Sequence, residues 1–107
     1  MTARTLAEYE HAAARTVNAS LDERQRLLDA CCGLAEEAGE VLAHVRKHVM
    51  QGRALDRDAL ATELGDALWC VAMAARAAGL SLDDVADRNV RKLEARHPEG
   101  LVAPPAR

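Results

Sequence analysis

The chain has very few aromatic and β-branched residues. Its 107 residues include no phenylalanine and no isoleucine, and Trp69 and Tyr9 are its only aromatic rings. Alanine (23) and leucine (14) far outnumber valine (8) and threonine (4), so good helix formers dominate. This composition argues against a β-sandwich, a barrel or an α/β sheet. A core of alanine, leucine and valine is thin for one domain of this length, so we expect part of the apolar surface to be buried between subunits.

Other features are missing as well. The net charge is -3 and no basic stripe runs along the chain, which argues against nucleic-acid binding. No apolar run approaches the roughly 20 residues of a membrane span, and the first residues lack the apolar core of a signal peptide. The three cysteines, Cys31, Cys32 and Cys70, form neither a disulfide framework nor a CxxC zinc motif. We therefore expect a cytoplasmic protein that contacts neither membrane nor nucleic acid.

Start and stop signals divide the chain into four expected helices, near residues 6–17, 21–50, 57–78 and 82–97. Capping boxes begin at Thr5 and Ser20, and Asp56 and Ser81 can cap two further helices; Gly52, Gly79 and Pro98 are the stop signals. The segment 98–107, with three prolines, is expected to be loose. We predict a single all-α domain over 1–107.

Two of these helices show long apolar stripes. The stripes consist of Leu27, Cys31, Leu34, Ala38, Val41, Val45 and Val49 in the second helix and of Leu60, Leu64, Ala67, Val71 and Ala78 in the third. Both follow the helical period of a buried face. Because the connections are short, the pattern predicts an antiparallel four-helix arrangement.

The most informative pattern is a repeated pair of carboxylates. A shift of 26 residues superimposes Glu37 and Glu40 on Glu63 and Asp66, with Gly39 on Gly65. Acids three apart lie on one helix face, so four carboxylates can converge where the stripes pack. Such acids repel one another unless a hard cation neutralises them, and ligands that are all oxygen suit magnesium or manganese.

Two neighbouring features sharpen this expectation. Asp66 is the only charged residue between Leu64 and Ala75, so we expect it to be buried and either paired or metal-bound. The matched glycines, Gly39 and Gly65, each cost about 1 kcal/mol within a helix, which suggests a close backbone approach.

The fourth helix supplies a basic line. Asn89, Lys92 and Arg96 fall on one face. They can form surface salt bridges or, beside a magnesium site, capture phosphate. His44 and His48 are spaced i, i+4, but they lack a third nitrogen ligand for zinc.

The spacing of these residues resembles a known family. Glu37-x-x-Glu40, 22 intervening residues, Glu63-x-x-Asp66 and then Asn89-x-x-Lys92-x-x-x-Arg96 are similar to the MazG-like nucleoside triphosphate pyrophosphohydrolases of the all-α NTP pyrophosphatase superfamily. The resemblance implies magnesium-dependent cleavage between the α and β phosphates, giving a monophosphate and pyrophosphate. It also implies a four-helix fold completed in a dimer or in a tetramer of paired dimers.

Carried over by position, Glu37, Glu40, Glu63 and Asp66 would be the metal ligands, and Asn89, Lys92 and Arg96 would contact the phosphates. Glu36, Glu37 and Glu40 are candidates for the general base, and Trp69 and Tyr9 are candidates for contact with the nucleobase. Two alternatives stay open: a noncatalytic helical dimerisation or regulatory module, and hydrolysis of phosphoribosyl-ATP.

Overall fold

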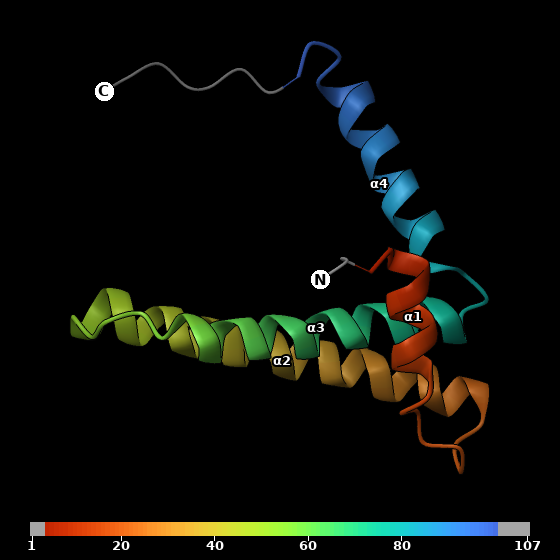
Figure 1. Ribbon diagram of the computed structural model, residues 1–107, viewed down its shortest axis with the longest axis horizontal. Coiled ribbons are helices and arrows are strands. Elements are labelled where there is room, and N and C mark those ends of the chain that lie inside the picture. Colours follow the sequence, from red (N-terminus) through yellow and green to blue (C-terminus); the bar gives the residue numbers. More distant parts are fainter. Residues whose placement is uncertain (1–3, 101–107) are drawn as a thin grey trace.

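The chain forms four helices. The computed structural model describes residues 4–100, and within them lie α1 (Leu6–Ala14), α2 (Glu23–Gln51), α3 (Arg57–Ala77) and α4 (Leu82–Arg96) (Figure 1). The described residues include no strand, so the all-α prediction is confirmed. Residues 101–107 of the segment predicted to be loose lie outside the described part. None of the described helices combines the length and the hydropathy needed to cross a membrane.

Most of the helix ends agree with the predicted capping signals. Thr5 and Glu8 form a reciprocal capping box at α1, Asp56 accepts from the amide of Ala59, and Ser81 accepts from the amide of Asp84. These side chains satisfy amides that have no partner inside the helix. The stop signals Gly52 and Gly79 both adopt left-handed backbone conformations, which glycine permits without steric cost.

Two boundary predictions were wrong. Asp22, and not Ser20, is the N-cap of α2, and it forms its capping box with Gln25. The hydroxyl and amide of Ser20 instead donate to the side chain of Asn18, a local turn that competes with helix formation. Helix α1 ends at Ala14 because the next amides bond three residues back and the hydroxyl of Thr16 donates to the carbonyl of Ala13.

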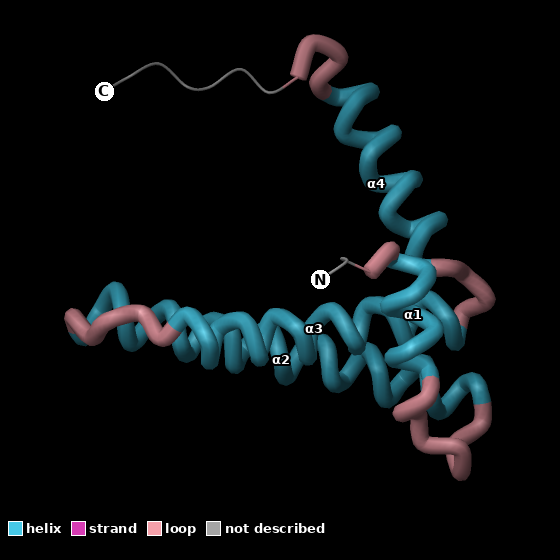
Figure 2. The backbone as a smooth tube through the Cα atoms, in the orientation of Figure 1, coloured by secondary structure: helices cyan, strands magenta, loops and turns pink. Residues whose placement is uncertain are grey.

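The helices do not close into a four-helix bundle within one chain. Helices α2 and α3 form a long antiparallel hairpin, α1 lies across one end of it, and α4 projects away (Figures 1 and 2). Among the described residues, α4 contacts α1 and α3 but not α2. The radius of gyration, 16.9 Å, exceeds the value of about 13 Å expected for a compact chain of this length. The antiparallel pairing is therefore limited to the hairpin.

The core lies where α1 meets the hairpin. It consists of Ala13, Ala30, Ala72, Met73 and Leu82, with Trp69 and Tyr9 packed against it. The predicted stripes are only half-buried or exposed: Leu34 and Val41 lie partly within the seam, whereas Val45 and Leu64 are exposed. Each long helix covers only one side of the other, so the single chain leaves much of both stripes in water.

The close approach of the two helices occurs at a glycine other than the predicted pair. A Cβ atom at Gly33 would lie 2.9 Å from Sγ of the buried Cys70, whereas one at Gly39 or Gly65 would meet nothing within 4 Å. The close approach predicted at Gly39 and Gly65 is therefore absent from the single chain. Gly33, which no sequence pattern marked for this role, lets α2 pack against α3.

We expect Gly33→Ala to be destabilising relative to Gly39→Ala. Both substitutions gain about 1 kcal/mol of helix propensity, but only the first crowds Cys70, at a cost of about 1–3 kcal/mol. Denaturant unfolding measures the free energy of unfolding of both variants. In the double variant Gly33→Ala/Cys70→Ala the cost of the Gly33 substitution should be smaller, because the crowded sulfur is removed. Equal stabilities for Gly33→Ala and Gly39→Ala would show that the contact with Cys70 is unimportant.

Candidate metal centre

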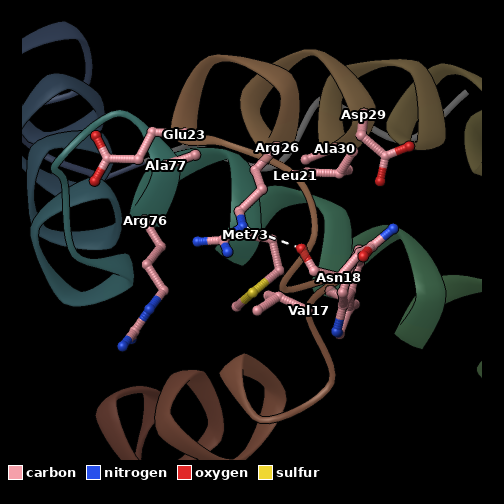
Figure 3. A pocket seen from close by; sticks show the side chains of 11 residues that line it. Val17, Asn18, Leu21, Glu23, Arg26, Asp29, Ala30, Met73, Arg76 and Ala77 are labelled. Atoms are coloured by element: carbon pink, nitrogen blue, oxygen red, sulfur yellow. Dashed lines mark hydrogen bonds between the residues drawn. The ribbon is translucent and has the colours of Figure 1, made fainter.

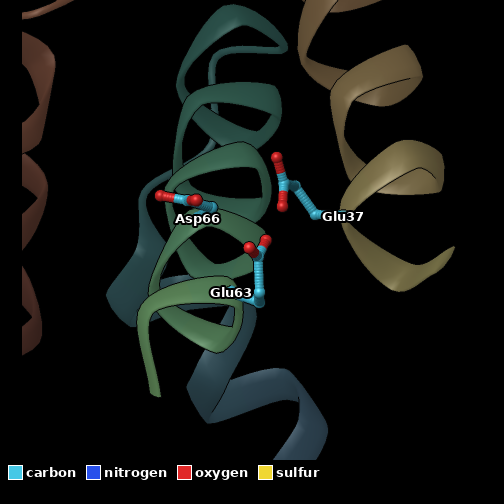
Figure 4. A group of neighbouring side chains, drawn as sticks. All are labelled: Glu37, Glu63 and Asp66. Atoms are coloured by element: carbon cyan, nitrogen blue, oxygen red, sulfur yellow. The ribbon is translucent and has the colours of Figure 1, made fainter. Parts of the chain in front are cut away.

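Three carboxylates meet across the hairpin. Glu37 extends from α2, and Glu63 and Asp66 stand one turn apart on α3 (Figure 4). One oxygen from each lies within 4.8 Å of the other two. The i, i+3 spacing on α3 places Glu63 and Asp66 on one face, and the antiparallel pairing with α2 brings Glu37 to that face. The helix seam thus gathers acids that are distant in sequence, as their pattern predicted.

Glu37 bears the strongest electrostatic effect of this cluster. Its pKa is raised from the ordinary 4.5 to about 7, chiefly because a proton on Glu37 can be shared with the carboxylate of Glu63. Partial burial and the negative charges of Glu63, Asp66 and Glu40 raise the pKa further. Without a cation, this carboxyl group is therefore protonated to a large extent at neutral pH, where an ordinary glutamate is ionised.

The cluster contains carboxylate oxygens that could act as ligands of a cation. Oε2 of Glu37 is buried and has no hydrogen-bond partner, a costly state for a carboxylate oxygen. Among the described residues, no lysine or arginine forms an ion pair with Glu37, Glu63 or Asp66. The nearest basic group is His44, with Nε2 3.9 Å from Oε1 of Glu63. These oxygens suit a hard divalent cation, so the residues present fit magnesium or manganese.

His44 and His48 do not form a zinc pair. The ring of His44 lies near Glu63, whereas Nδ1 of His48 is 2.7 Å from the carbonyl oxygen of Arg53, beyond the end of α2. The i, i+4 spacing thus serves two separate contacts.

The other predicted acids lie outside the three-residue group. Glu36 and Glu40 are both exposed on α2, and neither belongs to the set of mutually close oxygens. The burial predicted for Asp66 is wrong for the single chain, where this residue is exposed. Its apolar neighbours on α3 are covered only on the side that meets α2 and α1.

The predicted phosphate contacts are separated from the acids within one chain. Asn89, Lys92 and Arg96 are all exposed and lie on the part of α4 that projects from the hairpin (Figure 1). Because α4 does not contact α2, the basic line does not cover Glu37 in the same chain.

A pocket of about 300 Å³ lies beside the core, where the chain between α1 and α2 passes the end of α3 (Figure 3). Trp69 and Met73 line it together with Arg26, Asp29 and Arg76. The indole of Trp69 therefore contributes both to the core and to this pocket. Tyr9 also packs against the core, and its pKa is raised by burial, by the negative charge of Asp66 and, at a pH high enough to ionise it, by the thiolate of Cys70.

Sequence reasoning missed the contacts that shape this pocket. Nε1 of Trp69 donates to Oγ1 of Thr16 over 2.8 Å, and Arg26 donates to the carbonyls of Asn18 and Ala19. These bonds fasten the α1–α2 connection to both long helices. The bond from Trp69 reaches a hydroxyl 53 residues away in sequence, and those from Arg26 reach loop carbonyls seven and eight residues away; no periodic pattern marks such contacts.

Comparison with known proteins decides the family. A model of the MazG nucleotide pyrophosphohydrolase domain matches residues 25–101, which include every acid of the cluster and the basic line of α4. The chain belongs to the MazG nucleotide pyrophosphohydrolase family. The resemblance inferred from the carboxylate spacing is thereby confirmed.

This MazG chain is also similar to a phage protein. Gene 37 protein of Mycobacterium phage L5 is 36% identical over 74 residues, which cover 65% of the chain and 65% of the phage protein. The chain thus spans just under two thirds of that relative's length. No solved structure matches the chain.

The raised pKa of Glu37 predicts that the metal-free MazG chain loses stability as the pH rises. Below pH 4.5 Glu37 is protonated in both the folded and unfolded states. Between 4.5 and about 7 only the folded state keeps the proton, so the free energy of unfolding falls with pH. The melting temperature in a chelator should drop from pH 5 to pH 8 more in wild type than in Glu37→Gln. Glu94→Gln, an exposed acid on α4, is the control; equal pH dependence in wild type and Glu37→Gln would contradict the shift.

Proposed function

We propose that this chain is a magnesium-dependent pyrophosphohydrolase, which cleaves a nucleoside or deoxynucleoside triphosphate between the α and β phosphates. The observation that carries the proposal is the Glu37, Glu63 and Asp66 cluster, with its unpartnered Glu37 oxygen, in a member of the MazG family. Removal of non-canonical nucleotides is one role that such an activity would serve.

Each side chain has a part in the proposed reaction. Glu37, Glu63 and Asp66, with Glu40 from the next turn of α2, would hold Mg²⁺, or Mn²⁺ in its place. The bound metal supplies charge neutralisation for the phosphates and lowers the pKa of a coordinated water. A carboxylate of Glu36, Glu37 or Glu40 that is not fully used as a ligand would accept the proton of the attacking water. Trp69 and Tyr9 are the rings proposed to contact the base.

The basic line of α4 is proposed to serve the site of a second subunit. Lys92 and Arg96 offer a point charge and a planar fork for phosphate oxygens, yet α4 turns away from its own α2. In the proposed symmetric dimer each α4 would lie near the partner's acids, so that both sites would be completed together.

The surface of the single chain supports an oligomer. Its accessible area is 8529 Å², whereas a compact monomer of this mass exposes about 5,800 Å². The excess includes large apolar side chains on the hairpin and on α4: Leu42, Val45, Val49, Met50, Leu64, Leu68, Val90 and Leu93. We propose that this face packs against another copy of the chain, in a dimer or a dimer of dimers.

We expect Glu37→Gln and Asp66→Asn each to reduce turnover by at least about 100-fold, because both weaken the binding of the metal that stabilises transition-state charge. Pyrophosphate release with Mg²⁺ should be measured over a panel of canonical, deoxy and damaged nucleoside triphosphates and phosphoribosyl-ATP. Circular dichroism checks that helicity is kept. Near wild-type pyrophosphate release from either variant would refute the assignment, and no activity on any nucleotide would favour a noncatalytic module.

Complementation tests whether α4 acts across subunits. Asp66→Asn and Lys92→Ala/Arg96→Ala should each be nearly inactive, whereas an equal mixture that exchanges subunits should recover about a quarter of wild-type activity, since half of the dimers are mixed and each holds one intact site. If the mixture stays inactive while native mass spectrometry shows mixed dimers, then Lys92 and Arg96 act within their own chain.

A further inference from the structure

The side chain of Glu10 joins three helices. It lies on α1 and is only 13% exposed. Its Oε2 accepts a hydrogen bond from Nη1 of Arg76, on α3, over 3.1 Å, and its Oε1 accepts one from the backbone amide of Leu82, over 2.6 Å. That amide is the first of α4. Both carboxylate oxygens are therefore committed to partners on other helices.

Helix α4 has few other attachments. Leu82 is buried in the core, and Asp84, Val85 and Ala86 are half-buried, but every residue from Asp87 to Gly100 is exposed. Within its own chain the helix is thus held at its first turn alone. A carboxylate at this end accepts from an amide that has no partner inside the helix, and it is favoured by the positive end of the helix dipole.

The length of α4 makes the positions of Lys92 and Arg96 sensitive to the contacts at Leu82. With a rise of 1.5 Å per residue, Lys92 and Arg96 lie about 15 Å and 21 Å along the axis from Leu82. A change of about 10° at the first turn would move Arg96 by about 4 Å, more than the length of a hydrogen bond. The contacts at Leu82 therefore determine where the basic line points.

We propose that Glu10 is a positioning residue. It fixes the direction of α4, and through α4 it places Lys92 and Arg96 for phosphate binding. Arg76 is its partner in this role, because it holds the second oxygen of the same carboxylate. The inference rests on the proposed function for its effect on nucleotide binding, whereas the anchoring of α4 can be measured without any substrate.

The same arrangement ties the pocket beside the core to α4. Arg76 lines that pocket and also holds Glu10. Two hydrogen bonds, from Arg76 to Glu10 and from the Leu82 amide to Glu10, therefore connect the pocket wall to the first turn of α4. The ion pair between Arg88 and Asp84 does not connect α4 to another helix, because both residues lie on α4 and Arg88 is largely exposed to water.

The experiment compares Glu10→Gln and Arg76→Gln with the control Arg88→Gln in the full-length protein. Amide hydrogen exchange over residues 82–86 is measured without nucleotide, and KM and kcat are measured with Mg²⁺. For both test variants we expect exchange to accelerate by about tenfold or more, the factor for losing a hydrogen bond to a charged group. KM should rise by a similar factor and kcat should change less, because phosphate binding is weakened before and during the reaction. The double variant should add little to either single one.

Either of two results in the test variants overturns the proposal: exchange and KM within twofold of wild type in both variants, or faster exchange with unchanged KM. If Glu10→Gln does not fold, Arg76→Gln decides the question alone, since it leaves the bond to the Leu82 amide available. Arg88→Gln should match wild type in exchange and KM, and a change as large as that of the test variants would overturn the role given to Glu10. A wild-type chain without hydrolase activity contradicts the proposed function instead, and the exchange result then still shows whether Glu10 anchors α4.

Discussion

Carboxylates that face one another across a helix seam repel, and packing of α2 against α3 holds three of them together nonetheless. The seam is close because Gly33 leaves room for the Sγ atom of Cys70. The pKa of Glu37 is raised because its proton can be shared with Glu63 and because burial and the neighbouring negative charges disfavour its ionised form. Its Oε2 atom has no hydrogen-bond partner. A divalent cation would relieve both conditions, because it would replace the proton and offer the free oxygen a partner. The carboxylate cluster on which the proposed metal site depends is therefore a consequence of the hairpin.

The same hairpin cannot bury its own apolar surface. Two helices in contact shield only one side of each other, and α1 is too short to cover more than one end. Leu42 and Val49 are exposed as a result, and α4 extends into solvent with its own apolar residues, Val90 and Leu93, also exposed. A chain without phenylalanine or isoleucine has few means to close such a core alone. The proposed dimer would bury this apolar surface and bring α4 of one subunit to the acids of the other in the same contact.

The sequence was sufficient for features with a local cause. Helix bounds follow from propensity and capping groups such as Thr5 with Glu8 and Asp56, and the meeting of Glu37 with Glu63 follows from matched spacing on paired helices. Features that depend on tertiary packing were not predictable. Exposure of Asp66, the close approach at Gly33 in place of Gly39, and the direction of α4 depend on which faces other helices cover. Helical periodicity identifies an apolar face but does not say what lies against it.

Glu10 illustrates this limit and shows how a short helix can control a long one. In the sequence it is an ordinary acid on a helix of nine residues, and no pattern singles it out as the capping box singles out Glu8. Folding places it between a guanidinium and the first amide of α4, where a carboxylate is favoured by both partners. The hairpin and the basic line of α4 lie on separate elements, so the direction of α4 relative to its own hairpin must come from a third. Helix α1 provides it, since it packs against α3 and fastens the start of α4. In the proposed dimer that direction also determines where each α4 meets the acids of its partner.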